Sequence, residues 1–306
     1  MTNEQLLSAL QPPAHVVDVV LDTDTYNEID DQFALSYLLR SPERARVRGI
    51  FAAPFFNENS VSPEDGMEKS HREILKLLAL AGREELVPLV CRGSRRYLPN
   101  EDTPVPSEAA DRLLELSRGH TADRPLYVVA IGAITNIASA LLTDPGLKDR
   151  ICLVWLGGHA HRWPHTAEFN MMQDVAAARV VFGCGVPLVQ IPCCGVADRF
   201  STTQWELEHW LRGKNALCDY LIDHTVEAAE RYAAGQPWSR VIWDVTAVGW
   251  LIGGDRFTCS RLCRSPIPEY DHHYGFDDRR HPIRCVTEVY RDALIRDLFE
   301  KLGGQP

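Results

Sequence analysis

Five acidic side chains lie within ten residues, at a point where an apolar, strand-like run changes into a helix-like pattern. The segment reads VVDVVLDTDTYNEIDDQFALSYLL, and the acids are Asp22, Asp24, Glu28, Asp30 and Asp31. Like charges at the end of a strand repel one another, and burying them is costly unless a cation compensates. Helix capping would account for one or two acids but not for five. The cluster therefore predicts a divalent metal with oxygen ligands, calcium or magnesium, outside the EF-hand pattern.

Short apolar runs alternate with longer amphipathic ones along most of the chain. This βαβ alternation predicts an α/β fold with a mostly parallel central sheet, an open Rossmann-like sheet with helices on both faces. Ligands in such folds collect beyond the carboxyl ends of the strands, so the acidic cluster and the turns after the other strands are expected to share one rim. The apolar runs lie at 16–22, 47–55, 126–132, 151–158 and 186–194.

The chain is long and apolar enough for one substantial core, with 306 residues of which 45% are hydrophobic. We expect a single catalytic domain over residues 1–306. Two segments are predicted to be irregular: 94–108, rich in Pro and polar residues, as an exposed loop, and 259–282 as a surface excursion. The apolar spacing after residue 291 predicts a terminal helix.

Charge and cysteine content limit the function classes. A formal net charge of -10 opposes binding to a nucleic acid backbone. Nine cysteines at irregular spacings, and a start (MTNEQLLSALQPP) without a basic or apolar signal region, predict a reduced, cytoplasmic protein. No apolar run approaches the ~18 residues that a membrane span needs. We therefore expect a small-molecule substrate, no nucleic acid polymer and no membrane.

Polar residues elsewhere in the chain are candidates for the same rim. Asp244 is the only acid in the apolar run IWDVTAVGWLI, where it fits either a helix cap or a distant metal ligand. Glu168 and Asn170 lie two apart in AEFNMMQD, so on an extended stretch they would point the same way and could bind a pair of vicinal hydroxyls. The three histidines of GGHAHRWPHTAE are spaced as zinc ligands could be. No Cys or Glu at a suitable spacing completes that site, and no zinc is predicted.

Taken together, LDTDTYNEIDDQFAL, GAITNIASAL, AEFNMMQD and Asp244 resemble the inosine-uridine-preferring nucleoside hydrolase family, in order and spacing, from about residue 16 to residue 300. The resemblance implies an α/β domain of the nucleoside hydrolase type with one bound Ca²⁺. The implied activity is hydrolysis of the N-glycosidic bond of a ribonucleoside or related N-riboside by a metal-activated water. The resemblance also implies a homodimer or homotetramer and a role in purine or pyrimidine salvage.

The resemblance also implies the metal ligands and the catalytic base, position by position. Asp24, Asp31 and Asp244 match the metal-binding carboxylates of the family. The carbonyl of Ile131 stands where the family offers a backbone ligand. Asp24 also matches the base that deprotonates the water.

Sugar-binding residues are implied in the same way. Asp30 matches the residue that faces the ribose 2′-hydroxyl, and Glu168 and Asn170 match residues that hold the sugar hydroxyls. Asn57 matches an asparagine near the second strand.

Three features depart from the family's pattern. The acidic loop is two residues longer, because Asp24 and Asp30 are six apart. Trp243 stands where many members have a histidine that protonates the leaving base. Arg162 stands where an asparagine is common, which could favour a phosphate or carboxylate on the substrate. We expect Trp243 and Arg162 both to contact the substrate.

The missing histidine leaves two routes for departure of the base. Another side chain could protonate it, with Tyr26, His159, His273 and Tyr274 as the candidates. Alternatively, aromatic stacking on Trp243 could help an easier leaving group depart unprotonated.

Two other functions fit part of the pattern. Trp243 and Arg162 suggest a metal-stabilised nucleoside- or ribose-binding protein with lost or altered turnover. The VVLDTD segment suggests a haloacid-dehalogenase-like phosphatase with Asp22 as its nucleophile. That motif needs Thr or Val where Tyr26 stands, and the later acidic motif of such phosphatases is incomplete here.

Overall fold

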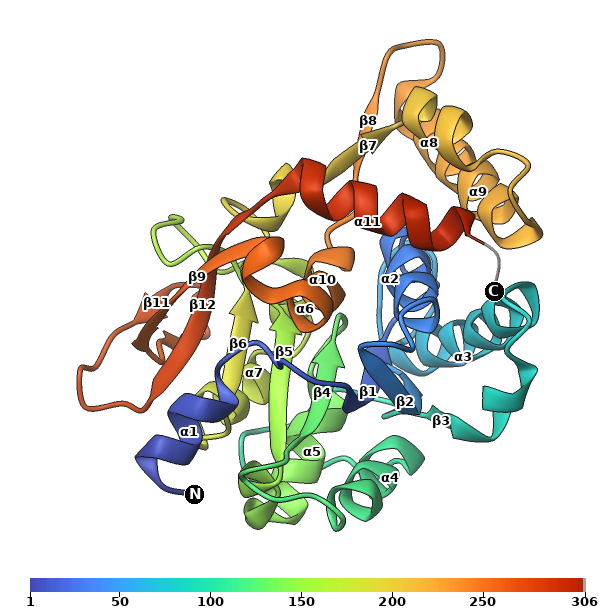
Figure 1. The fold of residues 1–306 in the computed structure, drawn as a ribbon. Coiled ribbons are helices and arrows are strands. Elements are labelled where there is room, and N and C mark those ends of the chain that lie inside the picture. The colour runs from blue at the N-terminus through green and yellow to red at the C-terminus, as the bar shows by residue number, and fades with distance from the viewer. Residues whose placement is uncertain (305–306) are drawn as a thin grey trace.

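The structure, a computed structural model that describes residues 1–304, is built on one eight-stranded sheet (Figure 1). The strand order is β3-β2-β1-β4-β5-β6-β12-β9, and only the β12–β9 pair is antiparallel. This confirms the predicted open, mostly parallel sheet. The strands are β1 (Val17–Thr23), β2 (Ala45–Ala52), β3 (Val90–Arg92), β4 (Leu126–Ala130), β5 (Ile151–Leu156), β6 (Leu188–Ile191), β9 (Thr258–Arg264) and β12 (Pro282–Val289).

Helices cover both faces of the sheet, as expected (Figure 1). On one face the core is shared by α2 (Asp30–Leu39), α3 (Pro63–Leu80), α8 (Gln204–Leu211), α9 (Ala216–Ala233), α10 (Val245–Gly253) and α11 (Arg291–Gly303). On the other face it is shared by α4 (Glu108–Ser117), α5 (Thr135–Thr143) and α7 (Val175–Gly183). Two short helices are α1 (Asn3–Ala9) and α6 (Phe169–Gln173). Among residues 1–304, no helix combines the length and apolar character that crossing a membrane requires.

Strand β1 shows why its sequence is an almost unbroken apolar run. Side chains alternate along a strand, so Val19 and Leu21 enter the core on one face while Val20 enters the core on the other. A central parallel strand is buried on both sides and needs apolar residues at every position. The apolar run ends at Leu21, the strand itself ends with Asp22 and Thr23, and Asp24 of the rim follows at once.

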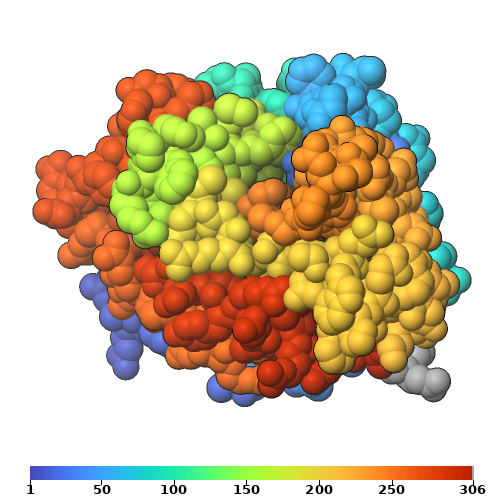
Figure 2. Space-filling model, turned by 90° about the horizontal axis from the view of Figure 1, so that it is seen from above, coloured from blue at the N-terminus to red at the C-terminus, as the bar shows by residue number. Residues whose placement is uncertain are grey.

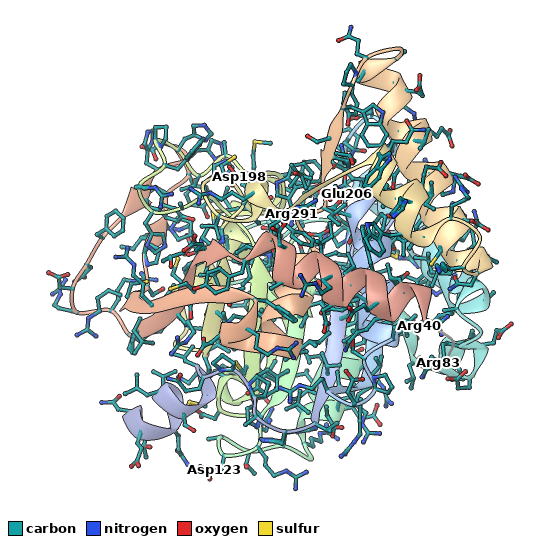
Figure 3. The ribbon with its side chains drawn as sticks, turned by 45° about the horizontal axis from the view of Figure 1, so that its top comes forward. Arg40, Arg83, Asp123, Asp198, Glu206 and Arg291 are labelled. Atoms are coloured by element: carbon teal, nitrogen blue, oxygen red, sulfur yellow. The ribbon has the colours of Figure 1, made fainter. Side chains whose placement is uncertain are left out.

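A small arm projects from the rim (Figure 1). The antiparallel strands β7 (Ser201–Thr203) and β8 (Ser239–Val241) enclose α8 and α9 in the sequence. An ion pair of 2.5 Å between Arg291 at the start of α11 and Glu206 of α8 ties this arm to the rest of the molecule (Figure 3). Arg291 also donates to the carbonyl of Ser201. These contacts fix the arm close to the residues that precede α10.

The prediction that 259–282 is irregular was wrong for its first part. Residues Thr258–Arg264 form β9, which pairs with β12 at the edge of the central sheet. Only every second or third side chain of β9 is buried or half-buried, because the strand has a neighbouring strand on one side only. Its polar sequence fits an exposed edge. A strand of this kind has no apolar run, so the sequence pattern did not predict it. The rest of the segment carries the short pair β10 (Ile267–Pro268) and β11 (Tyr274–Gly275). Residues 94–107 contain no helix or strand, as predicted.

Replacing Trp155 with Ala is expected to destabilise the fold by about 3–5 kcal/mol, because the substitution empties a large core position. Trp155 is fully buried, packs 5.9 Å from the ring of Phe182 and donates its indole N–H to the carbonyl of Gly132. Urea unfolding measures the free energy. The matched control is Trp205→Ala, at a position that is 67% exposed, where a change of about 0.5 kcal/mol or less is expected. Equal losses in the two variants would contradict this account.

Candidate active site

The acidic residues meet where β1 ends and α2 begins. Asp24 follows the last residue of β1, and Asp30 and Asp31 are the first two residues of α2. Asp244 comes from late in the sequence, at the N-cap position of α10. Each of the four is 5% exposed or less. Seen from above, segments from the blue, green, yellow and orange parts of the chain come together on this rim (Figure 2).

Three of the carboxylates form a tight cluster. Asp30, Asp31 and Asp244 each offer an oxygen, and these oxygens lie within 4.8 Å of one another. The cluster receives few hydrogen bonds: the Thr23 hydroxyl donates to Asp31, and the main-chain N–H of Asp244 donates to Asp30 at 3.4 Å. The charge of Arg240 favours the ionised form of Asp30 alone, so the three acids can all stay ionised only if a further cation lies among them, and otherwise they bind protons.

Asp24 is the least satisfied of these acids. Neither of its carboxylate oxygens has a hydrogen-bond partner among residues 1–304, and one oxygen of Asp31 is equally free. Gly132, in the turn after β4, leaves the space for this carboxylate: a Cβ there would lie 3.1 Å from the Asp24 Cγ and 3.0 Å from the Cβ of Ala53. Unpartnered buried oxygens of this kind are what a bound cation would satisfy.

Burial and mutual repulsion raise the pKa of these groups. Burial is the larger cause throughout, and it raises the pKa of Asp24 and Asp244 well above the ordinary range. The pKa of Asp31 rises to about 8 through burial and the charge of Asp30. Repulsion from Asp31 adds to the shift at Asp24, and repulsion from Asp30 adds to that at Asp244. A bound divalent cation would oppose every one of these shifts.

Asp22 supports the site from inside β1. It is fully buried, and the Asn136 side chain donates to it at 2.7 Å while accepting the main-chain N–H of Ser94. The contact with Asn136 gives Asp22 a supporting role and does not favour the phosphatase alternative, in which Asp22 would be the nucleophile. The sequence suggested only ordinary strand-to-helix packing for TNIASALL, so the role of Asn136 was missed.

A cavity of about 310 Å³ opens beside the carboxylates. Its wall combines acids with amides, thiols, an imidazole and aromatic rings. The predicted substrate-binding residues Asp30, Glu168, Asn170 and Trp243 all line it. The lining residues are Asn27, Glu28, Asp30, Ile131, Leu156, His159, Ala167, Glu168, Phe169, Asn170, Cys193, Cys194, Trp243 and Asp244.

Glu168 and Asn170 are held at the cavity by backbone contacts. Glu168 is the N-cap of α6 and accepts three main-chain N–H groups, from Gly158, Asn170 and Met171, at 2.7 to 3.0 Å. The Asn170 amide donates to the carbonyls of Ile131 and Leu156. The Ile131 carbonyl, expected to face a metal, therefore lies at the cavity wall with Asn170 as one partner. Burial raises the pKa of Glu168 to about 7.

Two predicted substrate contacts lie outside the cavity wall. The Asn57 amide donates to the side chain of Asn27 at 2.5 Å, and Asn27 itself lines the cavity. Arg162 is exposed and donates to the carbonyl of Gly195 at 3.0 Å. Asn57 therefore contacts a residue of the cavity wall, Asn27, and does not line the cavity itself.

Trp243 forms an aromatic wall that the longer acidic loop supports. Its ring lines the cavity, and the guanidinium of Arg240 lies 5.4 Å from its centre. Arg240 in turn forms an ion pair with Glu28, a residue of the longer loop. The loop therefore connects to Arg240 of β8, which lies against the indole.

Of the four candidates for assisting the leaving base, only His159 lines the cavity. Tyr26 is 45% exposed and lines a different hollow. His273 is exposed and lies beside Asp271. The Tyr274 hydroxyl lies behind His159, donating to the His159 carbonyl and accepting from Gln190.

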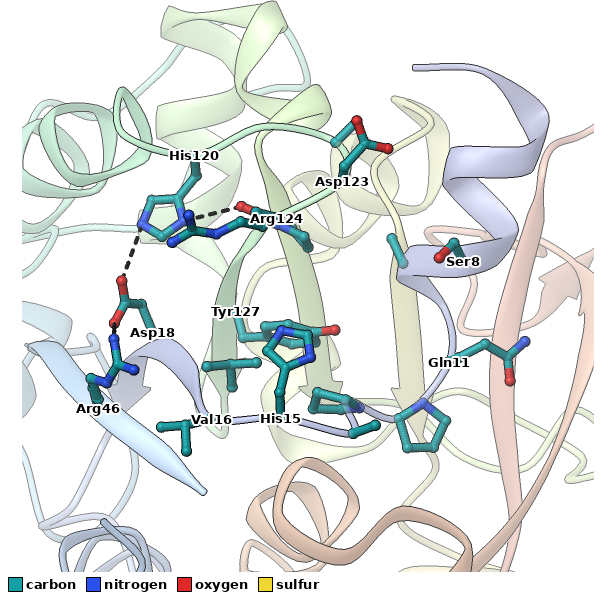
Figure 4. Close-up of a pocket in the computed structure, with 17 residues that line it drawn as sticks. Ser8, Gln11, His15, Val16, Asp18, Arg46, His120, Asp123, Arg124 and Tyr127 are labelled. Atoms are coloured by element: carbon teal, nitrogen blue, oxygen red, sulfur yellow. Dashed lines mark hydrogen bonds and ion pairs between the residues drawn. The ribbon is translucent and has the colours of Figure 1, made fainter. Parts of the chain in front are cut away.

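A larger cavity of about 790 Å³ lies at the opposite ends of the strands, near the start of β1 (Figure 4). Two acids line it: Asp18 contacts Arg48 at 2.9 Å and both Arg46 and His120 at 3.8 Å, and Asp123 accepts hydrogen bonds from the Gln5 amide. With its charge balanced and no cluster of free carboxylates, this cavity lacks the features that distinguish the rim.

A family model described as inosine-uridine preferring nucleoside hydrolase matches residues 19–296. The chain belongs to this nucleoside hydrolase family. A curated relative, the pyrimidine-specific ribonucleoside hydrolase RihA of Enterobacter sp. (strain 638), is 26% identical over 271 residues, which cover 78% of this chain and 80% of the relative. Hydrolysis of N-glycosidic bonds is the activity of the family.

Solved nucleoside hydrolases have the same fold. A plant nucleoside hydrolase, PpNRh1, superimposes with a TM-score of 0.76 at 20% identity, covering 96% of this chain and all (100%) of that one. A purine-preferring ribonucleoside hydrolase from Gardnerella vaginalis gives 0.74 at 22% identity, covering 94% and 98%. At these identities the likeness establishes the nucleoside hydrolase fold.

Family membership implies a divalent metal, and the buried oxygens fit one. The Asp24 carboxylate has no protein partner, and the neighbouring cluster offers only carboxylate oxygens. Hard cations such as calcium and magnesium select oxygen ligands.

The metal-free protein is expected to lose stability as the pH rises from about 4 to about 8. The Asp31 carboxyl has a pKa of about 8 in the folded protein against 3.8 ordinarily, so the folded state binds more protons across this window. Stability is thus highest below the unfolded pKa and falls toward the folded pKa. Urea unfolding of EDTA-treated protein at several pH values measures the trend, and Asp31→Asn should flatten it. Stability that rises with pH in this window would contradict it.

Proposed function

We propose that this chain is a calcium-dependent hydrolase of the N-glycosidic bond of ribonucleosides or closely related N-ribosides. The observation that carries the proposal is the fully buried, unpartnered carboxylate of Asp24 beside the Asp30, Asp31 and Asp244 cluster. Asp24 lies buried behind the wall of the cavity that Asp30, Ile131 and Asp244 line, and an unpartnered carboxylate there is costly unless a cation compensates it.

Asp24, Asp31, Asp244 and the carbonyl of Ile131 are the proposed ligands of the ion. When bound, calcium would neutralise these acids and polarise the water and sugar oxygens that reach it. Neither carboxylate oxygen of Asp24 accepts a hydrogen bond from the described residues, so both are free to accept a proton. Its proposed role is to take the proton of the water that attacks C1′.

The sugar is proposed to lie between α2 and α6. Asp30 and Glu168 would accept hydrogen bonds from the ribose hydroxyls, and the free oxygen of the Asn170 amide can do the same. These carboxylates would also stabilise the positive charge that develops on the ribose ring as the bond to the base lengthens. Asn57 acts through Asn27, which it holds in place.

The base is proposed to stack on Trp243. The ring is half-buried at the cavity wall, and Arg240 keeps it in position from the other side. Stacking is tolerant of the identity of the base, because every base has a π face. Arg162, outside the cavity, would meet only a substrate with an extended substituent.

Asp24→Asn is expected to lower kcat/KM for inosine and uridine by about 10³-fold, within the usual range for loss of a general base. Reducing-sugar release measures the rate. EDTA should abolish activity of the wild type, and added Ca²⁺ should restore it. The matched control is Asp18→Asn, at the opposite end of the same strand, which should keep wild-type activity. Full activity of Asp24→Asn, or of the EDTA-treated enzyme, would refute the mechanism.

Trp243→Ala is expected to raise KM for nucleosides more than it lowers kcat, because it removes a stacking surface of about 1–3 kcal/mol per base. Trp243→Phe should recover part of the loss. Steady-state kinetics with uridine and inosine measure both constants. An unchanged KM in Trp243→Ala would show that the base does not rest on this ring.

A binding protein without turnover is the second candidate, favoured by Trp243 in place of the histidine of many relatives. Calorimetric binding of a nucleoside with no release of sugar would support it. The homodimer or homotetramer, the cytoplasmic location and the role in salvage stay predictions.

A further inference from the structure

We propose that His159 assists departure of the base as a neutral hydrogen-bond donor, its Nε2–H pointing toward an acceptor atom of the base. This deepens the proposed function and rests on it. The residue lies in the turn after β5, on a different element from the Trp243 position. It is the only one of the four candidates named from the sequence that lines the cavity.

A single hydrogen bond sets the tautomer of the ring. The main-chain N–H of Cys194 lies 3.1 Å from His159 Nδ1. A backbone N–H can only donate, so Nδ1 must carry the lone pair, and the proton of the neutral ring sits on Nε2. The parallel strands β5 and β6 bring the two turns together, since Leu156 pairs with Ile191.

The turn that carries His159 is firmly held. The Cys193 N–H donates to the carbonyl of Gly158 at 2.8 Å, and the Ala160 N–H donates to the carbonyl of Cys194 at 3.1 Å. These two bonds flank the contact between Cys194 and the ring. The imidazole therefore keeps one orientation while substrate enters and leaves.

Surrounding groups keep the ring neutral. His159 is 4% exposed, and burial together with the neighbouring His165 lowers its pKa to about 4. A hydrogen bond to the backbone of Ala167 and the charge of Asp198 act in the opposite direction, and the net effect is still a lowered pKa. Protonating Nδ1 would also turn its bond with Cys194 into a contact between two donors.

The same side chains could be mistaken for a soft-metal site. His159, Cys193 and Cys194 bring donor atoms within 4.8 Å of one another. At Nδ1 the lone pair already accepts the Cys194 N–H, and a metal at Nε2 would need the proton on Nδ1, where that N–H points. The hydrogen bond thus favours a donor ring over a ligand ring.

The chemistry balances without a proton from His159. The C1′–N bond breaks and its electron pair goes to the base. The attacking water gives its oxygen to C1′ and one proton to Asp24. The Nε2–H stabilises the anion of the base through a hydrogen bond and keeps its proton, and solvent later protonates the released base. The suitable substrates are bases with a carbonyl oxygen or ring nitrogen that can accept this bond.

The test compares leaving groups that need such help with one that does not. His159→Phe should lower kcat/KM for uridine and inosine by about 10²-fold, at the low end for loss of an acid–base group. It should leave hydrolysis of 4-nitrophenyl riboside little changed, because nitrophenolate departs unaided. His159→Gln, which keeps a donor, should recover part of the activity on nucleosides. The matched control is His161→Phe, two residues away and bonded to Gln190, which should leave both substrates unaffected.

Several outcomes would overturn the proposal. An equal loss on nucleosides and on the nitrophenyl riboside would assign His159 a structural role only, and no loss on either would remove it from the reaction. An Nδ1–H tautomer or an imidazolium at neutral pH in ¹⁵N NMR spectra would contradict the donor geometry. So would a sulfur-to-cobalt charge-transfer band on adding Co²⁺ that disappears in Cys193→Ser. A wild type that cleaves none of these ribosides would refute the proposed function itself.

Discussion

The buried carboxylates at the rim are the constraint on which the rest of the structure depends. Asp24, Asp30, Asp31 and Asp244 repel one another in a place that water hardly reaches. Their neighbours relieve this only in part: the Thr23 hydroxyl donates to Asp31, the Asp244 main-chain N–H donates to Asp30, and the charge of Arg240 favours the ionised form of Asp30. Such an arrangement is costly in the absence of a cation, and it becomes favourable when an ion with oxygen ligands lies among the acids. The fold supplies the rigidity that keeps these groups together.

The cavity beside the acids differs from the family pattern in a coordinated way. The acidic loop is longer, and its Glu28 pairs with Arg240, which lies against the ring of Trp243. The longer loop therefore supports the Trp243 ring indirectly, through the ion pair between Glu28 and Arg240. Across the same cavity, His159 is oriented by the Cys194 main chain. We interpret the loop and the tryptophan as one set of departures from the family pattern, which together with His159 shape how the base is held and released.

Sequence patterns predicted five of the eight strands of the central sheet and missed β3, β9 and β12. Buried parallel strands such as β1 need apolar residues on both faces, and this leaves an unmistakable run. The edge strand β9 has one neighbour and many exposed residues, so its sequence resembles a loop. Asn136 was missed for a related reason: its amide acts on Asp22, a residue 114 positions away, and no local pattern reveals that contact.

The sequence by itself determined the α/β architecture, the acidic cluster and the resemblance to nucleoside hydrolases, because hydrophobic periodicity and short motifs are local properties of the chain. Tertiary structure decided which distant residues share the site. It brought Asp244 to within 4.8 Å of Asp30 and Asp31, and it placed His159 at the cavity while leaving Tyr26 outside. The physical reason is that the strand order of a parallel sheet brings distant turns to one edge, and spacing along the chain does not encode that order.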